Sequence, residues 1–586
     1  MNYIKKLIFI LLFSFILCYI SYDFFIPLYT SNNIIIEYGI HPFNICEEQP
    51  IIWKYCKIWF IISYIYSSIF ISNFIYKLFY NLFSYIPFKN KKEKLRNKNK
   101  LKSKNKFNSY DFLNINQNSL QLLIGENYET HQQIILPEKS LYQNILITGT
   151  IGTGKTSSAM YPFTRQLISY ESNNFGKKLG MLILDVKGNY FNKVLEFAKK
   201  YNREDDVIEI SLNSNYFYNP LHKPNLKPTV LANRLKTILL LFSKNNSESF
   251  WLDKAEQVLS EAIKLCRLYN NNYVTFQELH KLITNTDYYV KKIKLLRERF
   301  LSSNFDEKTT YDLLSAITFF ENDFLNLDSR TLSILKSEIT RITNTFICDY
   351  SVLSKFNPPI DKLNFLGFDE VLEEGKIVVL NMNINEYSNL SKIIAAYLKL
   401  DFQTDVMTRL ANYKDTNFRS VCFISDEYSE YCTDNDANFF SQSREAKCIN
   451  IVATQSYTSL LNTLHQKETV NVILQNLINK LWFRNDDIFT IETAQKQIGK
   501  EDKEKISTGI SENAKETVFS YFTNSLNSKN SSISETISKY THSDYIFDSK
   551  VFTQDLENFS CISFLSNGTK IIPPQKIHLF PYFLNK

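Results

Sequence analysis

Residues 149–156 read Gly-Thr-Ile-Gly-Thr-Gly-Lys-Thr and have the composition of a loop that binds nucleotide phosphates. The glycines let backbone N–H groups turn toward phosphate oxygens, Lys155 can reach the β- and γ-phosphates, and Thr156 can hold Mg²⁺. The chain has only 13 glycines, so three of them in one short loop argue against a glycine-rich turn with an accidental lysine. The sequence therefore predicts an ATP and Mg²⁺ site. The expected nucleotide-binding residues are Gly149, Thr150, Ile151, Gly152, Thr153, Gly154, Lys155, Thr156 and Ser157.

Two acids end the apolar run 421–424 after one intervening serine. Asp426 is expected to hold Mg²⁺ through water, and Glu427 to polarise the water that attacks the γ-phosphate. Alone, such a pair is weak evidence for an active site, because acids at a strand end can also be solvated caps. In a chain that also has a phosphate-binding loop the evidence is strong, because the carboxyl ends of parallel strands meet at one edge of a sheet.

Two more residues fit a motor better than a simple nucleotide switch. Gln455 follows the apolar run 449–453 and is expected to sense the γ-phosphate from the neighbouring strand. Arg444 precedes this run, where a ring of subunits would let it reach the next subunit's nucleotide and stabilise transferring charge. A surface arginine paired with Glu445 or Asp436 is an equal alternative.

Alternating apolar runs and helical stretches must position these residues. The chain has 586 residues, of which 44% are hydrophobic, so it is long enough for two to four domains. Apolar runs that alternate with helices predict an α/β fold with a parallel sheet covered on both faces. The expected strands are 120–125, 133–136, 144–148, 179–185, 207–212, 376–381, 421–424, 448–453, 478–483, 561–565 and 577–580, with helices over 156–169 and 391–409.

Two segments depart from this alternation. Residues 229–357 contain neither glycine nor proline, and Trp251, Ala255, Val258 and Ala262 repeat with helical spacing. This pattern predicts an all-helical domain inserted into the α/β domain. Residues 507–541 are rich in Ser, Asn and Thr and are expected to contain a mobile excursion.

The N-terminal region predicts a membrane anchor. Residues 7–26 form an apolar run broken only by Asp23, and residues 58–76 carry no charge, so each can cross a hydrocarbon core of about 30 Å. A cleaved signal peptide is the alternative for the first run, but no small-x-small cleavage site follows it. The flanking basic residues place both ends in the cytoplasm. Cys46 and Cys56 fall in or beside the short external loop, where a disulfide is possible.

Residues 89–106 hold ten basic residues and one acid. The segment alone carries a charge of +9 against +7 for the whole chain, so the rest is slightly acidic and bulk charge does not indicate that it binds nucleic acid. The simplest interpretation is a basic collar on anionic lipid headgroups, with a DNA-tracking patch as the alternative. The nine cysteines form no CxxC pair and the seven histidines have no ligand spacing, which argues against a zinc site.

Taken in order, these features resemble the type IV coupling proteins, the TraG/TraD-type ATPases of conjugation and type IV secretion. The resemblance implies a homo-hexameric, RecA-like P-loop ATPase with an all-α insertion and two transmembrane helices at the bacterial inner (plasma) membrane. Such a motor would recruit relaxase-bound single-stranded DNA (the relaxosome) or secreted proteins and deliver them to the components of a secretion channel. The residues that carry the resemblance are the two spans, 149–156, 185–188, 218–221, the helical insertion, 425–427, 453–456 and 566–583.

One position departs from the family. Asn189 stands where many members have an acid after the Asp-x-Lys-Gly motif, so the role of that acid cannot be carried over, although Asp185 and Lys187 stay near the nucleotide or DNA path. The expected domains are a membrane domain (1–88), a basic juxtamembrane linker (89–107), a RecA-like domain (108–228 and 346–586) and an inserted helical domain (229–345).

The predicted function is ATP-driven transfer of a relaxase–DNA or protein substrate. Two alternatives stay open. One is a receptor that binds secreted proteins with little motor activity, and the other is a channel-assembly or DNA-segregation ATPase of related fold.

Overall fold

A computed structural model describes residues 14–17, 19, 55, 58–59, 61–72, 119–185, 187–241, 249–302, 306–387, 389–412, 418–513, 519–520, 525–526 and 532–584. The chain divides into two compact units, Met1–Phe107 and Asn108–Lys586. In the first unit, residues 58–59 and 61–72 of the second expected span are helical, whereas most of the first span, Cys46, Cys56 and the basic segment lie outside the described residues. Among the residues that are described, no helix has the length and apolar character needed to cross a membrane.

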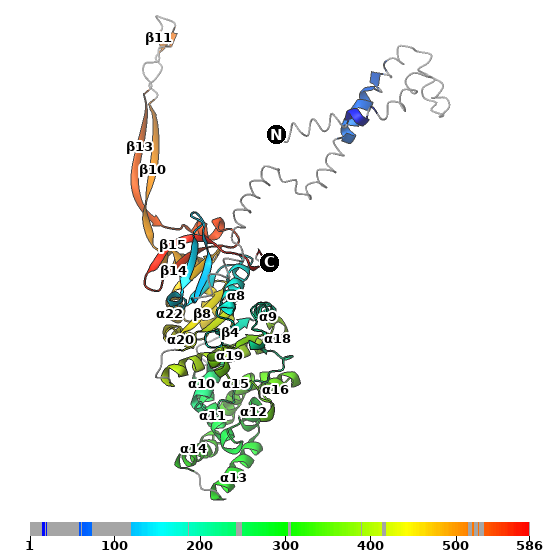
Figure 1. Ribbon diagram of the computed structural model, residues 1–586, viewed down its shortest axis with the longest axis vertical. Helices are drawn as coiled ribbons and strands as arrows, with labels where there is room; N and C mark the ends of the chain where they lie inside the picture. Colours follow the sequence, from blue (N-terminus) through cyan, green and yellow to red (C-terminus); the bar gives the residue numbers. More distant parts are fainter. Residues whose placement is uncertain are drawn as a thin grey trace, which may run out of the picture. The chain divides into compact units, whose positions relative to one another are not determined.

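The second unit is organised around one large mixed sheet (Figure 1). Its strand order is β2-β1-β15-β14-β9-β3-β8-β7-β4-β6-β5, in which the seven strands from β9 to β5 are parallel and the other four add to the β9 edge in antiparallel fashion. The bounds are β1 Gln121–Asn127, β2 Gln133–Pro137, β3 Ile145–Thr148, β4 Gly180–Asp185, β5 Val207–Ile210, β6 Ile377–Leu380, β7 Val421–Asp426, β8 Cys448–Thr454, β9 Asn479–Phe483, β14 Ser560–Ser566 and β15 Ile571–His578.

Both faces of the parallel strands are buried, as the continuous apolar runs require. On β3, Ile145 and Ile147 pack into one core with α8 (Tyr161–Ser169) and α9 (Tyr190–Lys200). Leu146 faces the opposite core, which the other helices fill. These helices are α19 Asn389–Asn412, α20 Asn435–Gln442, α21 Tyr457–Leu464 and α22 Lys467–Asn476. The predicted α/β class and every predicted strand are confirmed. The bounds shift by at most two residues, except that β15 begins at Ile571, six residues before the predicted start.

The helix expected over 156–169 begins differently. Its first turn is the π-helix η2 (Thr156–Met160), and α8 continues from Tyr161. The Ser158 hydroxyl donates to the Gly154 carbonyl at 2.8 Å, and the Ser158 N–H donates to the same oxygen at 2.8 Å. The Tyr161 N–H donates to the Thr156 carbonyl five residues back, which is the bond of a π-helix and gives the wider turn.

Between β5 and β6, the secondary-structure elements of the described residues are all helices, apart from one isolated β-bridge between Tyr218 and Phe365 (Figure 1). Side-chain oxygens of Thr275, Asp306, Asp328 and Asp349 each accept a backbone N–H at a helix start, so polar caps divide the helices where glycine and proline are missing. The core of these helices is continuous with that of the sheet, and the predicted domain limits 229–345 stay a prediction. The helices are α10 Pro228–Leu240, α11 Ser249–Tyr269, α12 Phe276–Thr284, α13 Thr286–Ser302, α14 Glu307–Thr318, α15 Ser329–Ile347, α16 Tyr350–Phe356 and α17 Asp369–Glu373, with the shorter turns η5 Phe319–Phe324 and η6 Ile360–Lys362.

The expectation of a mobile excursion over 507–541 stays a prediction, but the described ends of this segment are paired strands. Strands β10 (Lys500–Asn513) and β13 (Ser532–Tyr545) pair antiparallel without interruption as a separate two-stranded ribbon (Figure 1). Isoleucine and threonine recur within the serine-rich sequence, and β-branched residues favour strands. The composition therefore concealed a strand pattern.

A buried charge cluster joins the helical segment to α19. Asp401 on α19 forms ion pairs with Arg234 of α10 and, at 2.8 Å, with Lys223, and it accepts a hydrogen bond from the Tyr218 hydroxyl at 2.5 Å. The neighbouring Asn219 donates from its side chain to the Val274 carbonyl at 2.8 Å. The 218–221 motif therefore ties the helical segment to the sheet.

We expect Asp401→Asn to lower the free energy of unfolding by about 3–5 kcal/mol, because two buried cations lose their counter-charge. Asp253→Asn is the matched control, since Asp253 pairs at 2.5 Å with Lys236 of the same α10 but is 63% exposed in its side chain; it should cost under about 1 kcal/mol. Chemical denaturation measures both variants. Equal losses would contradict a buried cluster that anchors α10.

Candidate nucleotide-binding site

The phosphate loop leaves the carboxyl end of β3 with an unusual backbone. Gly152 and Gly154 have φ of 79° and 96°, values that side chains other than glycine rarely adopt. A Cβ on Gly154 would lie 2.4 Å from the ring of Phe559, and one on Gly149 would lie 2.6 Å from the Cβ of Phe483. The loop thus needs glycine for conformation at two positions and for close packing at two.

Lys155 lies buried within the loop. Its ammonium group donates to the Gly149 carbonyl and, at 3.0 Å, to the Thr150 carbonyl. Burial lowers the pKa of Lys155, and the nearby carboxylates of Asp426 and Glu427 oppose this shift. The lysine is therefore held at the loop, 8% exposed, among acids that favour its charged form.

Thr156 and Asp426 meet across the sheet edge. The Thr156 hydroxyl donates to Asp426 Oδ2 at 2.9 Å, although 270 residues separate the two in sequence. Hydroxyl and carboxylate oxygens are hard donors of the kind that Mg²⁺ prefers, and Mg²⁺ usually takes few protein ligands together with phosphate oxygens and water. The donor set therefore fits the predicted Mg²⁺. Within the described part of the chain, no group of three or more His, Cys, Asp or Glu side chains could form a larger metal site.

A second carboxylate makes the surroundings of Asp426 acidic. Asp185 ends β4 in register with Asp426 at the end of β7. Burial, reinforced by Asp185 and Glu427, raises the pKa of Asp426 to about 6, while Lys187 and the Thr156 hydrogen bond oppose the rise. The site without a cation thus holds an aspartate that is costly to ionise.

Glu427 is held on both carboxylate oxygens. Its backbone is left-handed, with φ of 58°, which is uncommon for a non-glycine residue and is found where surrounding structure enforces it. Oε1 accepts from the Lys187 ammonium at 2.5 Å, and Oε2 accepts from the Gln455 amide at 3.3 Å. Although burial opposes the change, the bond to Glu427 raises the pKa of Lys187, so this lysine stays charged.

The motif around Lys187 has a structural role of its own. Asp185 accepts the backbone N–H groups of Lys187, Asn189 and Tyr190 at 2.9, 3.0 and 3.1 Å. Asp185 therefore shapes the turn that leads into α9 and places Lys187 opposite Glu427. Asn189 contributes its backbone N–H, which is independent of the side chain that departs from the family pattern.

Buried tyrosines support the turn after Glu427. The Tyr431 hydroxyl lies 2.6 Å from Ser425 Oγ and donates to the Asp426 carbonyl at 3.2 Å. The Tyr428 hydroxyl donates at 2.5 Å to Asp436, which also pairs with Lys399 at 2.6 Å, and both members of that pair are fully buried. The left-handed conformation of Glu427 is therefore enforced by a closed polar network.

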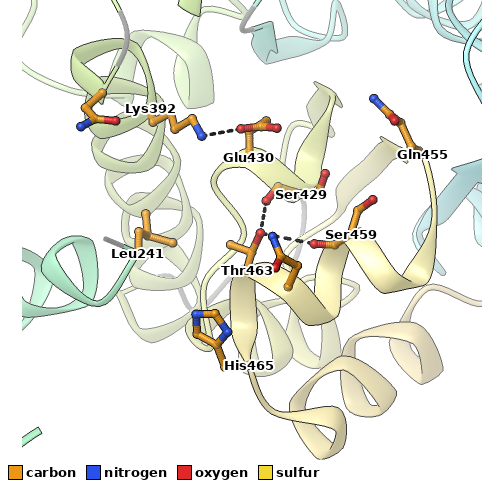
Figure 2. Close-up of a pocket in the computed structure, with 10 residues that line it drawn as sticks. Leu241, Lys392, Ser429, Glu430, Gln455, Ser459, Thr463 and His465 are labelled. Atoms are coloured by element: carbon orange, nitrogen blue, oxygen red, sulfur yellow. Dashed lines mark hydrogen bonds and ion pairs between the residues drawn. The ribbon is translucent and has the colours of Figure 1, made fainter. Parts of the chain in front are cut away.

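Gln455 lies between two cavities. A cavity of about 610 Å³ beside the phosphate loop is lined by Gln455 together with Thr150, Ile151 and Arg484. A second cavity, of about 700 Å³, lies between α19 and α21 and contains the Lys392–Glu430 ion pair of 2.6 Å (Figure 2). Since Gln455 also bonds Glu427, its side chain connects both cavities to the acidic site.

The structure brings together the 149–156 loop, Asp426, Glu427 and Gln455, but it does not bring Arg444 to them. Arg444 is exposed in the turn before β8, at the amino ends of the parallel strands, whereas the phosphate loop follows their carboxyl ends. The alternative partner Asp436 is taken by Lys399. Within one chain, Arg444 therefore lies a strand length from the loop.

Sequence reasoning missed the ion pair of Lys187 with Glu427 and the packing of Phe559 on the loop. The 185–188 motif indicated that Lys187 has a role, but only the strand order shows that β4 and β7 are neighbours, which brings Lys187 to Glu427. No local signal marked Phe559, which is more than 400 residues from the loop that it contacts.

The comparisons with known proteins agree with this geometry. Residues 420–544 match the family model described as the TraM recognition site of TraD and TraG. The fold is similar to the bacterial conjugative coupling protein TrwBdeltaN70 (TM-score 0.52, 11% identity, 81% of this chain and 91% of that one). The resemblance to type IV coupling proteins is confirmed.

Two other structures of this coupling protein are equally relevant to the fold. The form in complex with ADP and Mg²⁺ has a TM-score of 0.51, and the form with the non-hydrolysable ATP analogue ADPNP has 0.50; each is 11% identical and covers 81% of this chain and 92% of that one. No curated protein sequence matches the chain. The mixed α/β fold with one large central sheet is thus similar to that of TrwB.

We expect Asp426→Asn to raise the melting temperature of the nucleotide-free protein at pH 8 in EDTA by a few degrees. The raised pKa means that ionising Asp426 costs the folded state up to about 2–3 kcal/mol above pH 6, and amide substitution removes this cost. Below about pH 4, where the acid is protonated in both states, the two proteins should melt alike. Calorimetry from about pH 3 to pH 8 measures this difference, with exposed Asp486→Asn as control. Destabilisation at pH 8 would contradict it.

Proposed function

We propose that the chain is an ATPase that couples its hydrolysis cycle to the transfer of a relaxosome or protein substrate through a type IV secretion channel. The observation that carries this proposal is the Thr156–Asp426 hydrogen bond at the end of the phosphate loop, with the carboxylates of Asp426 and Glu427 both near Lys155. The structures of TrwB with ADP and Mg²⁺ and with an ATP analogue support nucleotide and Mg²⁺ as its cofactors.

The residues divide the chemistry among them. Bound Mg²⁺ would supply positive charge to the phosphate oxygens, with Thr156 and Asp426 to hold it. Lys155 would turn from the loop carbonyls toward the β- and γ-phosphates. Glu427 would orient the attacking water and accept its proton. If the Gln455 amide leaves Glu427 Oε2, it would be free to contact the γ-phosphate.

Substrate, assembly and location are proposals that follow from the family. The match of 420–544 to a TraM recognition site supports a relaxosome partner. A homo-hexamer is the proposed assembly, and Arg444 could approach a nucleotide only in another subunit, because the chain's own loop lies at the other end of the strands. The apolar runs 7–26 and 58–76 and the basic collar support a two-span anchor at the inner membrane with the ATPase unit in the cytoplasm.

We expect Glu427→Gln to bind ATP as the wild type does but to lose turnover by at least about a hundredfold, because the water loses its base. Lys155→Ala should weaken ATP binding itself. Steady-state hydrolysis with and without single-stranded DNA, alongside nucleotide-binding measurements, tests both variants. Stimulation by DNA that both variants lose supports a translocating motor. Normal turnover in Glu427→Gln would refute the assignment, and ATP binding without any DNA stimulation would favour the receptor.

The full chain should remain in the membrane pellet after extraction at alkaline pH, because two apolar spans hold it. A variant with neutral residues at the ten basic positions of 89–106 should stay in the pellet but associate less with anionic vesicles. Fractionation and vesicle flotation measure these properties. Release of the wild-type chain into the supernatant would contradict the anchor.

A further inference from the structure

The phosphate loop has a second flank that the groups described above do not use. In the sheet, β7 with Asp426 and Glu427 lies two strands to one side of β3, and β14 lies two strands to the other. The turn before β14 carries Phe559, and the short helix η9 (Tyr582–Leu584) packs against η2 on this flank. Aromatic side chains are concentrated there.

Phe559 is fixed against the loop. Its N–H donates to the Thr153 carbonyl at 3.0 Å, and its carbonyl accepts from the Leu579 N–H at 2.8 Å. Its φ is 65°, in the left-handed region that a large side chain adopts only when neighbouring structure holds it. The ring packs so closely on Gly154 that even one methyl group there would clash.

The aromatic surface extends from Phe559 toward solvent. The centroids of the Phe559 and Phe583 rings lie 5.9 Å apart, and those of the Phe583 and Tyr582 rings lie 5.6 Å apart. Tyr582 packs edge-on at 5.2 Å against Tyr161, which is one helical turn beyond the loop residue Ser157. Phe583 is 44% exposed. The loop is therefore bordered by aromatic side chains, of which Phe583 is the exposed one and Phe559 is partly exposed.

The position of these rings suggests what they bind. This step rests on the proposed function, in which the γ-phosphate points to Glu427 and Asp426. The rest of the nucleotide must then extend along the loop toward the opposite flank, where the aromatic surface lies. Bases stack on aromatic side chains, and alanine in place of such a side chain typically weakens binding by about tenfold or more.

We propose that Phe559 and Phe583 form the surface on which the base of the bound nucleoside triphosphate stacks. Ring faces contact the π-face of a base and do not read its hydrogen-bonding edge. The site should therefore bind ATP and GTP with similar affinity. Its selectivity would lie in distinguishing a nucleotide from bare triphosphate.

The test compares the affinities of ATP, GTP and inorganic tripolyphosphate for the full-length protein with Mg²⁺, by titration calorimetry. Phe559→Ala and Phe583→Ala should each lower the affinity for ATP and GTP by about tenfold and leave the affinity for tripolyphosphate unchanged. Phe559→Leu keeps apolar bulk against Gly154 and should lose most of the same affinity. Tyr350→Ala, which removes an aromatic ring that is 82% exposed on α16, is the control and should change nothing.

Three results would overturn the inference. In the first, the variants bind ATP with the affinity of the wild type. In the second, the affinities for ATP and tripolyphosphate fall equally, because the loop itself is deformed; in the third, the wild type binds these two ligands with equal affinity. In each case the proposed ATPase can stand, since the wild type still binds ATP. A wild-type chain that binds none of the three ligands would instead refute the proposed function, and with it this inference.

Discussion

The parallel alignment of β3, β8 and β7 is the constraint on which the site depends. It places the phosphate loop and the acids of β7 at one edge of the sheet, with a single strand between them, and the Thr156–Asp426 hydrogen bond of 2.9 Å results. Continuous apolar runs make the alignment stable, because both faces of these strands are buried by helices. Any shift of register would separate hydroxyl and carboxylate.

The same alignment brings acidic side chains close together, and nearby cations compensate their repulsion. Asp185, Asp426 and Glu427 converge at adjacent strand ends, and Lys155 and Lys187 are the cations placed among them. The buried tyrosine network and the Lys399–Asp436 pair hold Glu427 in a strained conformation behind these charges. Such a site lowers the stability of the fold but favours binding of a cation and phosphates. A bound cation would offset the repulsion among its acids.

Sequence patterns predicted much of this arrangement because the signals were local. Every predicted strand appeared, since the apolar runs were continuous, and the loop and Asp426–Glu427 were recognisable from residue type and spacing. The strands of the ribbon β10–β13 were not predicted, because the composition of this segment is polar. The bond of Lys187 with Glu427 and the packing of Phe559 on Gly154 join segments hundreds of residues apart, so they required the strand order.

The most direct test of this account is a structure of the full-length Glu427→Gln variant with ATP and Mg²⁺, determined by cryo-electron microscopy. The account predicts Mg²⁺ beside the Thr156 hydroxyl and Asp426, with Lys155 turned from the loop carbonyls to the phosphates. The γ-phosphate should lie next to Gln455. Density for the nucleotide away from residues 149–156, or for Mg²⁺ remote from Asp426, would contradict the central claim that the ends of β3 and β7 form one ATP site.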